Sequence, residues 1–467
     1  MKDGIKMFMN DIAVIICNFN GGTETVRCIE EVIKSKDTQL DIYVIDNAST
    51  DDSVSLIRSR FSNHVTIIRN PENMGGSGGF GRGLRLAVEK GYPYIMMLDN
   101  DAYVDTDTIK KLYDYLKENP DVGIVGAKIM MSDDPERVMD YAKVINFETF
   151  IDESQWCWKL DSDATKIPRD CDFAAATAAM TRREVLLKCG GMDEEYFIYY
   201  DDIELGYRIK KSGYRVVSLG SAKAWHKSGM RQRRENTFVR YYITRNRHRF
   251  FAKYLPEKDI ERFTEFMLSR AFSYMYGSYY KGRMDIFDTE KYILEDFIRD
   301  RRGKAGERRV NELQKNGYHL IENELSGCKR ILIYPADEVP EHCIVKFCCR
   351  LCEINPDIVI VISTAFGIKS EFCLQQIRDR LKRNCPNITV AEVSNRNSFD
   401  RAVYFCGHVK DITKNILPDI YIDVYGNMIA NEQDYFYFRN YEKSYDFFHG
   451  LYHDSIIETI NKIRKEG

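Results

Sequence analysis

Hydrophobic and polar residues follow two alternating rhythms over the first 130 residues. Short apolar runs predict buried strands, and the stretches between them carry apolar residues at helical spacing. The expected strands are residues 12–17, 41–46, 65–70, 94–99 and 122–129, and the expected helices are residues 23–35, 49–61, 80–90 and 106–118. Strands that alternate with helices predict a mostly parallel α/β sheet covered by helices on both faces.

This rhythm stops after residue 130 and restarts near residue 329. Residues 131–170 lose periodicity and suggest an inserted loop or lid. Residues 235–325 are aromatic and charged, have a helical pattern, and include a polar connector near their end. Strand and helix patterns follow, including a helix at about 369–383, and they indicate a second small α/β domain. We therefore expect three parts, residues 1–235, a helical extension 236–325, and a C-terminal α/β domain 326–467 of unknown role.

Composition changes this picture little. The 467 residues carry a net charge of −3, which implies no general attraction to nucleic acid or to an anionic membrane. No apolar run approaches the roughly 20 residues of a membrane-spanning helix, and MKDGIKMFMN has no apolar signal region. The 13 cysteines then favour a reducing cytoplasm. Cys349 and Cys352 form one CxxC inside a predicted helix, which favours buried thiols over a zinc site.

A glycine-rich segment, NMGGSGGFGRG at 73–83, follows the third expected strand. The spacing of Gly76, Gly78 and Gly81 matches a dinucleotide-binding pattern. In dinucleotide-binding folds such glycines follow the first strand directly, whereas two strand–helix units precede them here. We therefore reject a dehydrogenase and expect a loop whose backbone approaches another nucleotide closely.

Two carboxylates stand where the strand 94–99 ends. Asp99 and Asp101 are two residues apart, so on an extended backbone they point the same way, about 7 Å apart. Two convergent carboxylates suit a divalent cation that neutralises a diphosphate. Because loops at the carboxyl ends of parallel strands form ligand crevices, a functional pair is favoured over a solvated turn.

Several motifs in order resemble one enzyme family. VIICNFNGG, VIDNASTDDS, NMGGSGGFGRG, LDNDA, and YFIYYDDIELGYRIKKSGY with AWHK together resemble the inverting family-two glycosyltransferases of GT-A fold, over roughly residues 11–250. The glycine segment looks most like bacterial galactofuranosyltransferases, with rhamnosyltransferases next. The resemblance implies a GT-A domain over residues 1–235 that moves galactofuranose from UDP-galactofuranose to a cell-surface glycan or a lipid-linked acceptor. A dTDP-rhamnose-dependent transferase is the alternative, and a non-catalytic glycan-binding scaffold is a more distant one.

The same resemblance assigns roles to residues. Asp99, Asp101 and His226 would hold Mn²⁺ or Mg²⁺, and Asp202 would be the base that takes the proton of the acceptor hydroxyl. Crowding by Asp201 would raise one pKa of this acid pair toward working pH. Donor contacts are expected from Asn18, Asp46, Asn47, Asn73, Gly75, Gly76, Gly78, Arg82 and Asp99, and acceptor contacts from Asp201 and Glu204. Trp156 and Trp158 lie in the inserted stretch, which matches no family motif, and acceptor contacts are expected from them because their rings can stack on sugar faces.

Most of these residues have a structural alternative. The expected caps of the helix at 49–61 are Ser49 or Thr50, and Asp46 could also serve only to cap this helix. Arg82 could simply face solvent. The acid pair Asp201–Asp202 could merely compensate the dipole of the helix that it opens. His226 taken alone would more often be structural, and the tryptophans could fill a core.

A basic and aromatic segment covers residues 227–254. Nucleic acid binding is one interpretation of it. The acidic overall balance instead favours contact with the donor diphosphate, a lipid-linked pyrophosphate acceptor or the membrane surface, with a solvated helix face as the alternative. The expected partners are thus a nucleotide sugar and a glycan or lipid-linked acceptor, without nucleic acid. The expected location is the cytoplasm, at the inner face of the membrane, and a homo-oligomer is compatible with the sequence.

Overall fold

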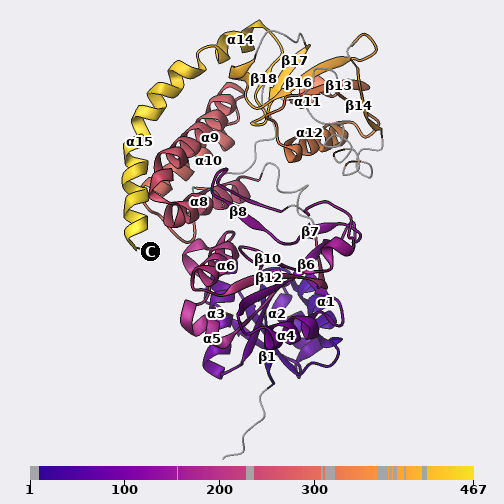
Figure 1. Ribbon diagram of the computed structural model, residues 1–467, viewed down its shortest axis with the longest axis vertical. Coiled ribbons are helices and arrows are strands. Elements are labelled where there is room, and N and C mark those ends of the chain that lie inside the picture. The colour runs from indigo at the N-terminus through magenta and orange to yellow at the C-terminus, as the bar shows by residue number, and fades with distance from the viewer. Residues whose placement is uncertain are drawn as a thin grey trace, which may run out of the picture. The chain divides into compact units, whose positions relative to one another are not determined.

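The computed structural model (Figure 1) describes residues 10–154, 156–227, 236–306, 309–310, 321–364, 377, 381, 387–393, 396–412 and 418–466. The chain folds into two compact units: unit 1 is Met1–Ile260, Asp296–Val310 and Thr459–Gly467, and unit 2 is Glu261–Glu295 and Asn311–Glu458. The three-part division drawn from the sequence stays a proposal. The helix expected at 369–383, most of the polar connector, and residues 228–235 of the basic segment lie outside the described residues.

Unit 1 contains every strand and helix that the pattern of residues 12–130 predicts. The strands are β1 Ile12–Asn18, β2 Leu40–Asp46, β3 Val65–Arg69, β4 Tyr94–Asp99 and β6 Val122–Met131. The helices between them are α1 Gly22–Ile33, α2 Ser53–Phe61, α3 Gly75–Lys90 and α4 Thr108–Glu118. β1 pairs in parallel with both β2 and β4, and β2 pairs in parallel with β3. The mostly parallel α/β sheet is therefore confirmed.

Five further strands among the described residues join this sheet, one of them between β4 and β6 along the chain and the other four after β6. The added strands are β5 Ala102–Val104, β7 Val138–Asp140, β10 Pro168–Asp170, β11 Ala178–Arg182 and β12 Arg215–His226, and the main order is β10-β12-β6-β11-β4-β1-β2-β3. β11 enters antiparallel between β4 and β6. In the stretch without periodicity, β8 Val144–Asn146 and β9 Ile151–Glu153 form a separate antiparallel pair.

Alternating side chains of the strands build a core on each face of the sheet. On β1, Ile12, Val14 and Ile16 pack with apolar residues of α1, α2 and α4. Ala13 and Ile15 point the other way and pack with residues of α3, of α5 (Arg183–Cys189) and of α6 (Asp201–Lys211). This arrangement of helices around the sheet can be followed in Figure 1. All five of these β1 side chains are at most 2% exposed, as a strand between two helical layers requires.

Unit 2 contains a second, smaller sheet in the order β15-β14-β13-β16-β17-β18. Its strands are β13 Arg330–Pro335, β14 Val359–Ser363, β15 Ile388–Ala391, β16 Arg401–Cys406, β17 Ile420–Asp423 and β18 Met428–Ile429, parallel except for β18. This confirms the predicted second α/β sheet. The CxxC lies on α12 (Glu341–Ile354), and within the described residues no potential metal-ligand cluster includes a cysteine.

The remaining described helices are between 5 and 26 residues long, and the last two were not predicted. They are α8 Thr237–Tyr254, α9 Ile260–Tyr280, α10 Met284–Ile298, α11 Ile321–Leu325, α14 Glu432–Phe438 and α15 Tyr441–Glu466. None of the helices that the structure describes has both the length and the apolar character of a membrane span.

Candidate active site

The carboxyl ends of three neighbouring parallel strands bring predicted site residues to one edge of the sheet. Asn18 at the end of β1 is in register with Asp46 at the end of β2. On the other side of β1, Cys17 is in register with Asp99 at the end of β4. Because parallel strands end at the same edge, these side chains share one region, where open α/β sheets bind their ligands.

Asp99, Asp101 and His226 converge although 125 residues separate the last two. β5 pairs antiparallel with the end of β12, and its register places His226 opposite Ala102, directly after Asp101. Nε2 of His226 lies 3.0 Å from Oδ1 of Asp101 and 4.0 Å from Oδ2 of Asp99. One ligand atom from each of the three residues lies within 4.8 Å of the others. Two carboxylates and an imidazole at this spacing form a donor set that fits a divalent cation.

Asp201 and Asp202 open α6, as predicted, and hydrogen bonds fix both side chains. Oγ of Ser77 donates to Oδ2 of Asp201 at 2.9 Å, and the backbone N–H of Ala176 donates to Oδ2 of Asp202 at 3.3 Å. Burial, and then the charge of Asp201, raise the pKa of Asp202 to about 7, although Lys143 opposes the rise. Burial also raises the pKa of Asp201. A carboxyl with a pKa near neutrality can serve as a general base.

A short segment before β11 joins the two groups of acids. The carbonyl of Thr177 accepts from the backbone N–H of Asp99 at 3.2 Å. The neighbouring residue, Ala176, is the one that donates to Asp202. The charge of Asp99 is also among the influences that raise the pKa of Asp201. The candidate metal ligands and the candidate base are therefore adjacent, separated by a segment of two residues.

The turn that presents Asp201 has a strained backbone. Phe197, Tyr199 and Tyr200 have φ angles of 66°, 65° and 68°, a region that side chains larger than glycine seldom adopt. Asn246 on α8 holds this turn, because its Nδ2 donates to the carbonyls of residues 196, 198 and 199 at 2.8–2.9 Å. Strain of this kind clusters at functional sites and persists where the surroundings enforce it. Sequence analysis missed Asn246, since no motif links it to a turn 47 residues upstream.

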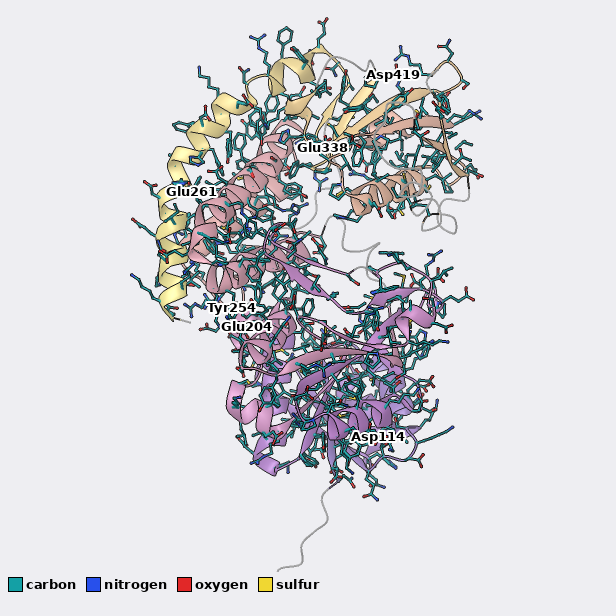
Figure 2. The ribbon with its side chains drawn as sticks, viewed as in Figure 1. Asp114, Glu204, Tyr254, Glu261, Glu338 and Asp419 are labelled. Carbon is teal, nitrogen blue, oxygen red and sulfur yellow. The ribbon has the colours of Figure 1, made fainter. Side chains whose placement is uncertain are left out.

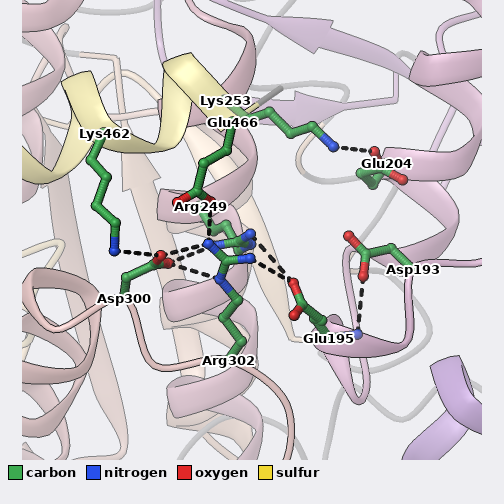
Figure 3. Close-up of polar contacts among 9 residues, drawn as sticks. All are labelled: Asp193, Glu195, Glu204, Arg249, Lys253, Asp300, Arg302, Lys462 and Glu466. Carbon is green, nitrogen blue, oxygen red and sulfur yellow. Dashed lines mark hydrogen bonds and ion pairs between the residues drawn. The ribbon is translucent and has the colours of Figure 1, made fainter.

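A charge network in unit 1 further anchors the same turn (Figure 3). Glu195 lies 2.9 Å from Arg302 and 3.6 Å from Arg249 of α8. Asp300 accepts from Arg249 at 2.6 Å and lies 3.4 Å from Lys462 of α15. Lys462 of α15 therefore helps to hold the turn that precedes the acid pair. No local sequence pattern predicts this contact.

The expected glycine loop is wrong, because α3 already begins at Gly75. Gly75 alone in this run has a positive φ, of 70°, and a Cβ there would overlap the carbonyl of Phe197. A Cβ on Gly79 would overlap Sγ of Cys17 on β1. These glycines let the helix pack closely against β1 and the strained turn, and this packing outweighs their low helix propensity. Gly76 borders the acid pair, since a Cβ there would lie 4.0 Å from Oδ2 of Asp201.

Polar groups predicted to contact the donor are bonded within the protein. Nδ2 of Asn18 donates to Oδ1 of Asp46 at 2.9 Å, and Oδ2 of Asp46 lies 3.3 Å from Nε of Arg69. Nδ2 of Asn47 donates to the carbonyl of Gly75 at 2.7 Å. Asn18, Asp46 and Asn47 are at most 2% exposed. They shape the edge of the sheet, and their direct contact with a nucleotide stays a prediction.

Asn73 and Arg82 complete the predicted donor set. Oδ1 of Asn73 accepts from the backbone N–H of Gly75 at 2.8 Å, next to the start of α3. Nη1 of Arg82 donates to the carbonyl of Arg69 at 2.9 Å and also contacts Asn70. Arg82 thus lies against the end of β3, and the structure does not test its approach to a diphosphate.

The expected caps of α2 are also wrong. The helix begins at Ser53, so Ser49 and Thr50 lie outside its first turn. Oγ of Ser49 instead accepts from Nδ2 of Asn18 at 3.1 Å and from the backbone N–H of Asn20 at 2.9 Å. Ser49 therefore links the loops after β1 and β2 at the candidate site.

Glu204 is held in a buried polar network with residues of α8, of which Tyr254 is labelled in Figure 2 and Lys253 in Figure 3. Its carboxylate, which is fully buried, accepts from Arg208 at 2.8 Å, Lys253 at 2.9 Å and Tyr254 at 2.7 Å. Burial alone would raise the pKa of Glu204, but these partners, chiefly Arg208, lower it. These contacts fix α8 against α6, and the acceptor-binding role predicted for Glu204 finds no support in them.

Replacing Glu204 by glutamine is expected to lower the free energy of unfolding by about 3 kcal/mol, because it breaks a buried charge network. Denaturant unfolding monitored by circular dichroism measures this loss. The exposed Glu184, which pairs with Arg182 at 3.0 Å, provides a control whose glutamine variant changes stability by less than about 1 kcal/mol. An unchanged unfolding midpoint, together with a raised KM for the acceptor, would instead restore the acceptor role of Glu204.

Trp156 and Trp158 lie in the insertion between β9 and β10, and both are partly buried. Trp156 packs on a small core that includes Met130, Val138 and Tyr141. Trp158 has a φ of 70°, and its backbone pairs with the carbonyl of Val138. These contacts agree with the core-filling alternative, and stacking on a sugar stays a prediction for both residues.

The basic segment is not a solvated helix face where the structure describes it. Arg245 and Arg247 on α8 are 3% and 6% exposed, and His248 is also buried. The guanidinium of Arg245 lies 5.2 Å from the ring centre of Tyr241. The side chains of α8 thus build the interior of unit 1 and support the turn before the acid pair, so the alternative of a solvated face is wrong.

Comparisons with known proteins find sequence similarity to glycosyltransferases. Residues 13–190 match the glycosyl transferase family 2 model. The galactofuranosyltransferase GlfT2 of Mycolicibacterium smegmatis is 25% identical over 196 residues, which are 38% of this chain and 30% of that protein. The N-acetylglucosaminyl-diphospho-decaprenol L-rhamnosyltransferase of Mycobacterium tuberculosis is 22% identical over 237 residues, 47% of this chain and 76% of that protein.

Among solved structures, a mannosyltransferase from Pyrobaculum calidifontis in complex with GDP-Man and Mn²⁺ is similar with a TM-score of 0.39 and 19% identity. The match covers 53% of this chain and 64% of that one. The family match covers the first strands of the sheet, the glycine segment and both acids of the Asp99–Asp101 pair. The family match agrees with the resemblance drawn from the sequence motifs, and the mostly parallel sheet agrees with the expected α/β fold. Residues 13–190 of the chain are therefore similar to the family 2 glycosyltransferases.

Proposed function

We propose that this chain is a metal-dependent inverting glycosyltransferase that moves galactofuranose from UDP-galactofuranose to a cell-surface glycan or a lipid-linked acceptor. The observation that carries the proposal is the position of Asp99, Asp101 and His226 beside the acid pair Asp201–Asp202. A lipid-linked acceptor would bring the enzyme to the inner face of the membrane.

On this proposal the ends of β4 and β12 hold Mn²⁺ or Mg²⁺ through Asp99, Asp101 and His226. When bound, the cation supplies positive charge for the diphosphate of the donor. The residues themselves are positioned for this by the β5–β12 pairing, which sets Nε2 of His226 3.0 Å from a carboxylate oxygen of Asp101. Asn18 and Asp46, hydrogen-bonded to each other, then shape the neighbouring edge where the nucleoside would lie.

Asp202 acts as the general base. It accepts the proton of the acceptor hydroxyl while that oxygen attacks the anomeric carbon of the donor sugar, and the bond from this carbon to the diphosphate breaks with its electron pair leaving on the phosphate oxygen. A single displacement of this kind inverts the anomeric centre. The pKa of about 7 keeps enough carboxylate at neutral pH while making it basic enough to take the proton.

The donor sugar is decided by assay. Galactofuranosyl- and rhamnosyltransferases are both among the relatives. The assay therefore compares UDP-galactofuranose with dTDP-rhamnose and measures the nucleoside diphosphate that each releases, with and without acceptor glycan. We expect kcat/KM for UDP-galactofuranose to exceed that for dTDP-rhamnose by at least about 100-fold, because sites built around specific sugar hydroxyls discriminate strongly. The reverse preference would make the chain a rhamnosyltransferase. Binding of both donors without turnover of either would support the glycan-binding scaffold.

A further inference from the structure

Two histidines and two glutamates face each other across two helices of unit 2. Glu261 and Glu265 are four residues apart on α9, and His449 and His453 are four residues apart on α15, so each pair lies on one helix face. Nε2 of His453 lies 2.8 Å from Oε1 of Glu261, and Nε2 of His449 contacts Oε1 of Glu265. Glu261 is labelled in Figure 2, where α9 and α15 run side by side.

Both imidazoles present the same nitrogen to the carboxylates. Their rings stack with centroids 4.6 Å apart and planes inclined by 29°. One ligand atom from each of Glu265, His449 and His453 lies within 4.8 Å of the other two. Three ligand atoms so close together can reach one ion, and Glu261 lies beside this group through its 2.8 Å contact with His453.

Neighbouring groups orient these ligands. Nδ1 of His453 lies 2.9 Å from Oδ1 of Asp454, and a carboxylate only accepts, so Nδ1 carries the hydrogen. Nε2 of His453 is then the nitrogen that faces the carboxylate of Glu261. Oη of Tyr445 donates to Oε2 of Glu265 at 2.9 Å, which leaves Oε1 for the histidine side. Carboxylates and hydroxyls that fix ligands in this way accompany protein metal sites.

We propose that Glu265, His449 and His453 bind one divalent transition-metal ion, with Zn²⁺ the best fit, and that Glu261 positions His453. Two imidazoles disfavour Mg²⁺ and Ca²⁺, which prefer oxygen ligands only, and three protein ligands leave the fourth position of a tetrahedral zinc ion to solvent. The side chains of His449 and His453 are 31% and 19% exposed, so an ion reaches them from solvent. The bound ion ties α9 to α15 and stabilises unit 2. This site is independent of the proposed glycosyltransferase chemistry.

The test uses the full chain without a histidine tag, after treatment with a chelator. Substitutions D101N and H226Q are introduced first, so that the candidate active site does not contribute a second ion. Zn²⁺ alone is then titrated by calorimetry, and the Tm is measured with and without Zn²⁺. We expect one ion per chain and a rise of Tm with Zn²⁺. Co²⁺ in place of Zn²⁺ should give the visible absorption of a tetrahedral complex.

Variants of the three ligands decide the outcome. H449Q and H453Q are each expected to weaken Zn²⁺ binding by at least about tenfold, and the double variant should lose the Zn²⁺-dependent rise of Tm. E265Q retains the shape of the side chain and provides a second ligand variant where a histidine variant folds poorly. H64Q, at an exposed histidine of unit 1, is the matched control and should bind Zn²⁺ like the parent. Absence of Zn²⁺ binding by the parent, or parent-like affinity in the double variant, would show that the four residues form only histidine–glutamate hydrogen bonds.

Discussion

Replacing Asp202 by asparagine is expected to lower kcat for sugar transfer by about 100- to 10,000-fold, because an amide cannot take the proton of the acceptor hydroxyl. The side chain keeps its shape and its hydrogen bond from Ala176, so donor binding should persist. Initial rates of transfer and calorimetric titration with the donor measure the two effects separately. The exposed Asp114 of α4, labelled in Figure 2, gives a matched control, and its asparagine variant should transfer sugar at the parent rate. A D202N variant with parent activity would exclude Asp202 as the base.

The same carboxyl sets the pH dependence of the reaction. Asp202 must be deprotonated to act, and burial with the charge of Asp201 raises its pKa to about 7. The value of kcat/KM should therefore rise with pH up to about 7 and level off above it, and this acid limb should be absent from the residual activity of D202N.

For stability the sign is opposite, since a raised pKa in the folded state means that ionisation of Asp202 destabilises the fold as pH rises toward 7. At pH 8 the D202N variant should consequently have a Tm no lower than that of the parent.

Removal of divalent cations should lower transfer by at least about 100-fold, since a bound cation contributes several kcal/mol of charge stabilisation to a departing diphosphate. Mn²⁺ or Mg²⁺ added back should restore the rate, and rates measured against the concentration of each ion show which one serves better. D101N and H226Q should require more metal for half-maximal rate, because Oδ1 of Asp101 and Nε2 of His226 form the 3.0 Å contact of the donor set.

The control for this experiment is H64Q, which alters an exposed histidine and should follow the parent curve. Full activity of the parent in the presence of a strong chelator would contradict a metal-dependent transfer. In that case Asp99, Asp101 and His226 would form a hydrogen-bonded cluster that does not hold a metal ion.

The first half of the fold could be predicted because its signals are local. Each strand of residues 12–130 is a short apolar run, and each helix between strands repeats its apolar residues at helical spacing. The position of Asp99 and Asp101 at a strand end follows from the same pattern, since β4 ends at Asp99 where the apolar run stops. Local patterns gave a wrong prediction where a residue is required for packing against a segment that is distant in the sequence. The glycines at 75–79 signal a loop, yet contacts with Cys17 and Phe197 require them inside or at the start of a helix.

The sequence by itself determined the parallel sheet, the acid pairs and the similarity to family 2 glycosyltransferases, because each of these depends on residues that lie together in short segments. Only the tertiary structure decided how distant side chains meet. The antiparallel β5–β12 pairing brings His226 to Asp101, Asn246 of α8 holds the turn before Asp201, and the face of α15 carries His449 and His453 to the glutamates of α9. Strand pairing and helix packing between segments 47 to 192 residues apart are set by the burial of complete surfaces, which no local spacing of residues encodes.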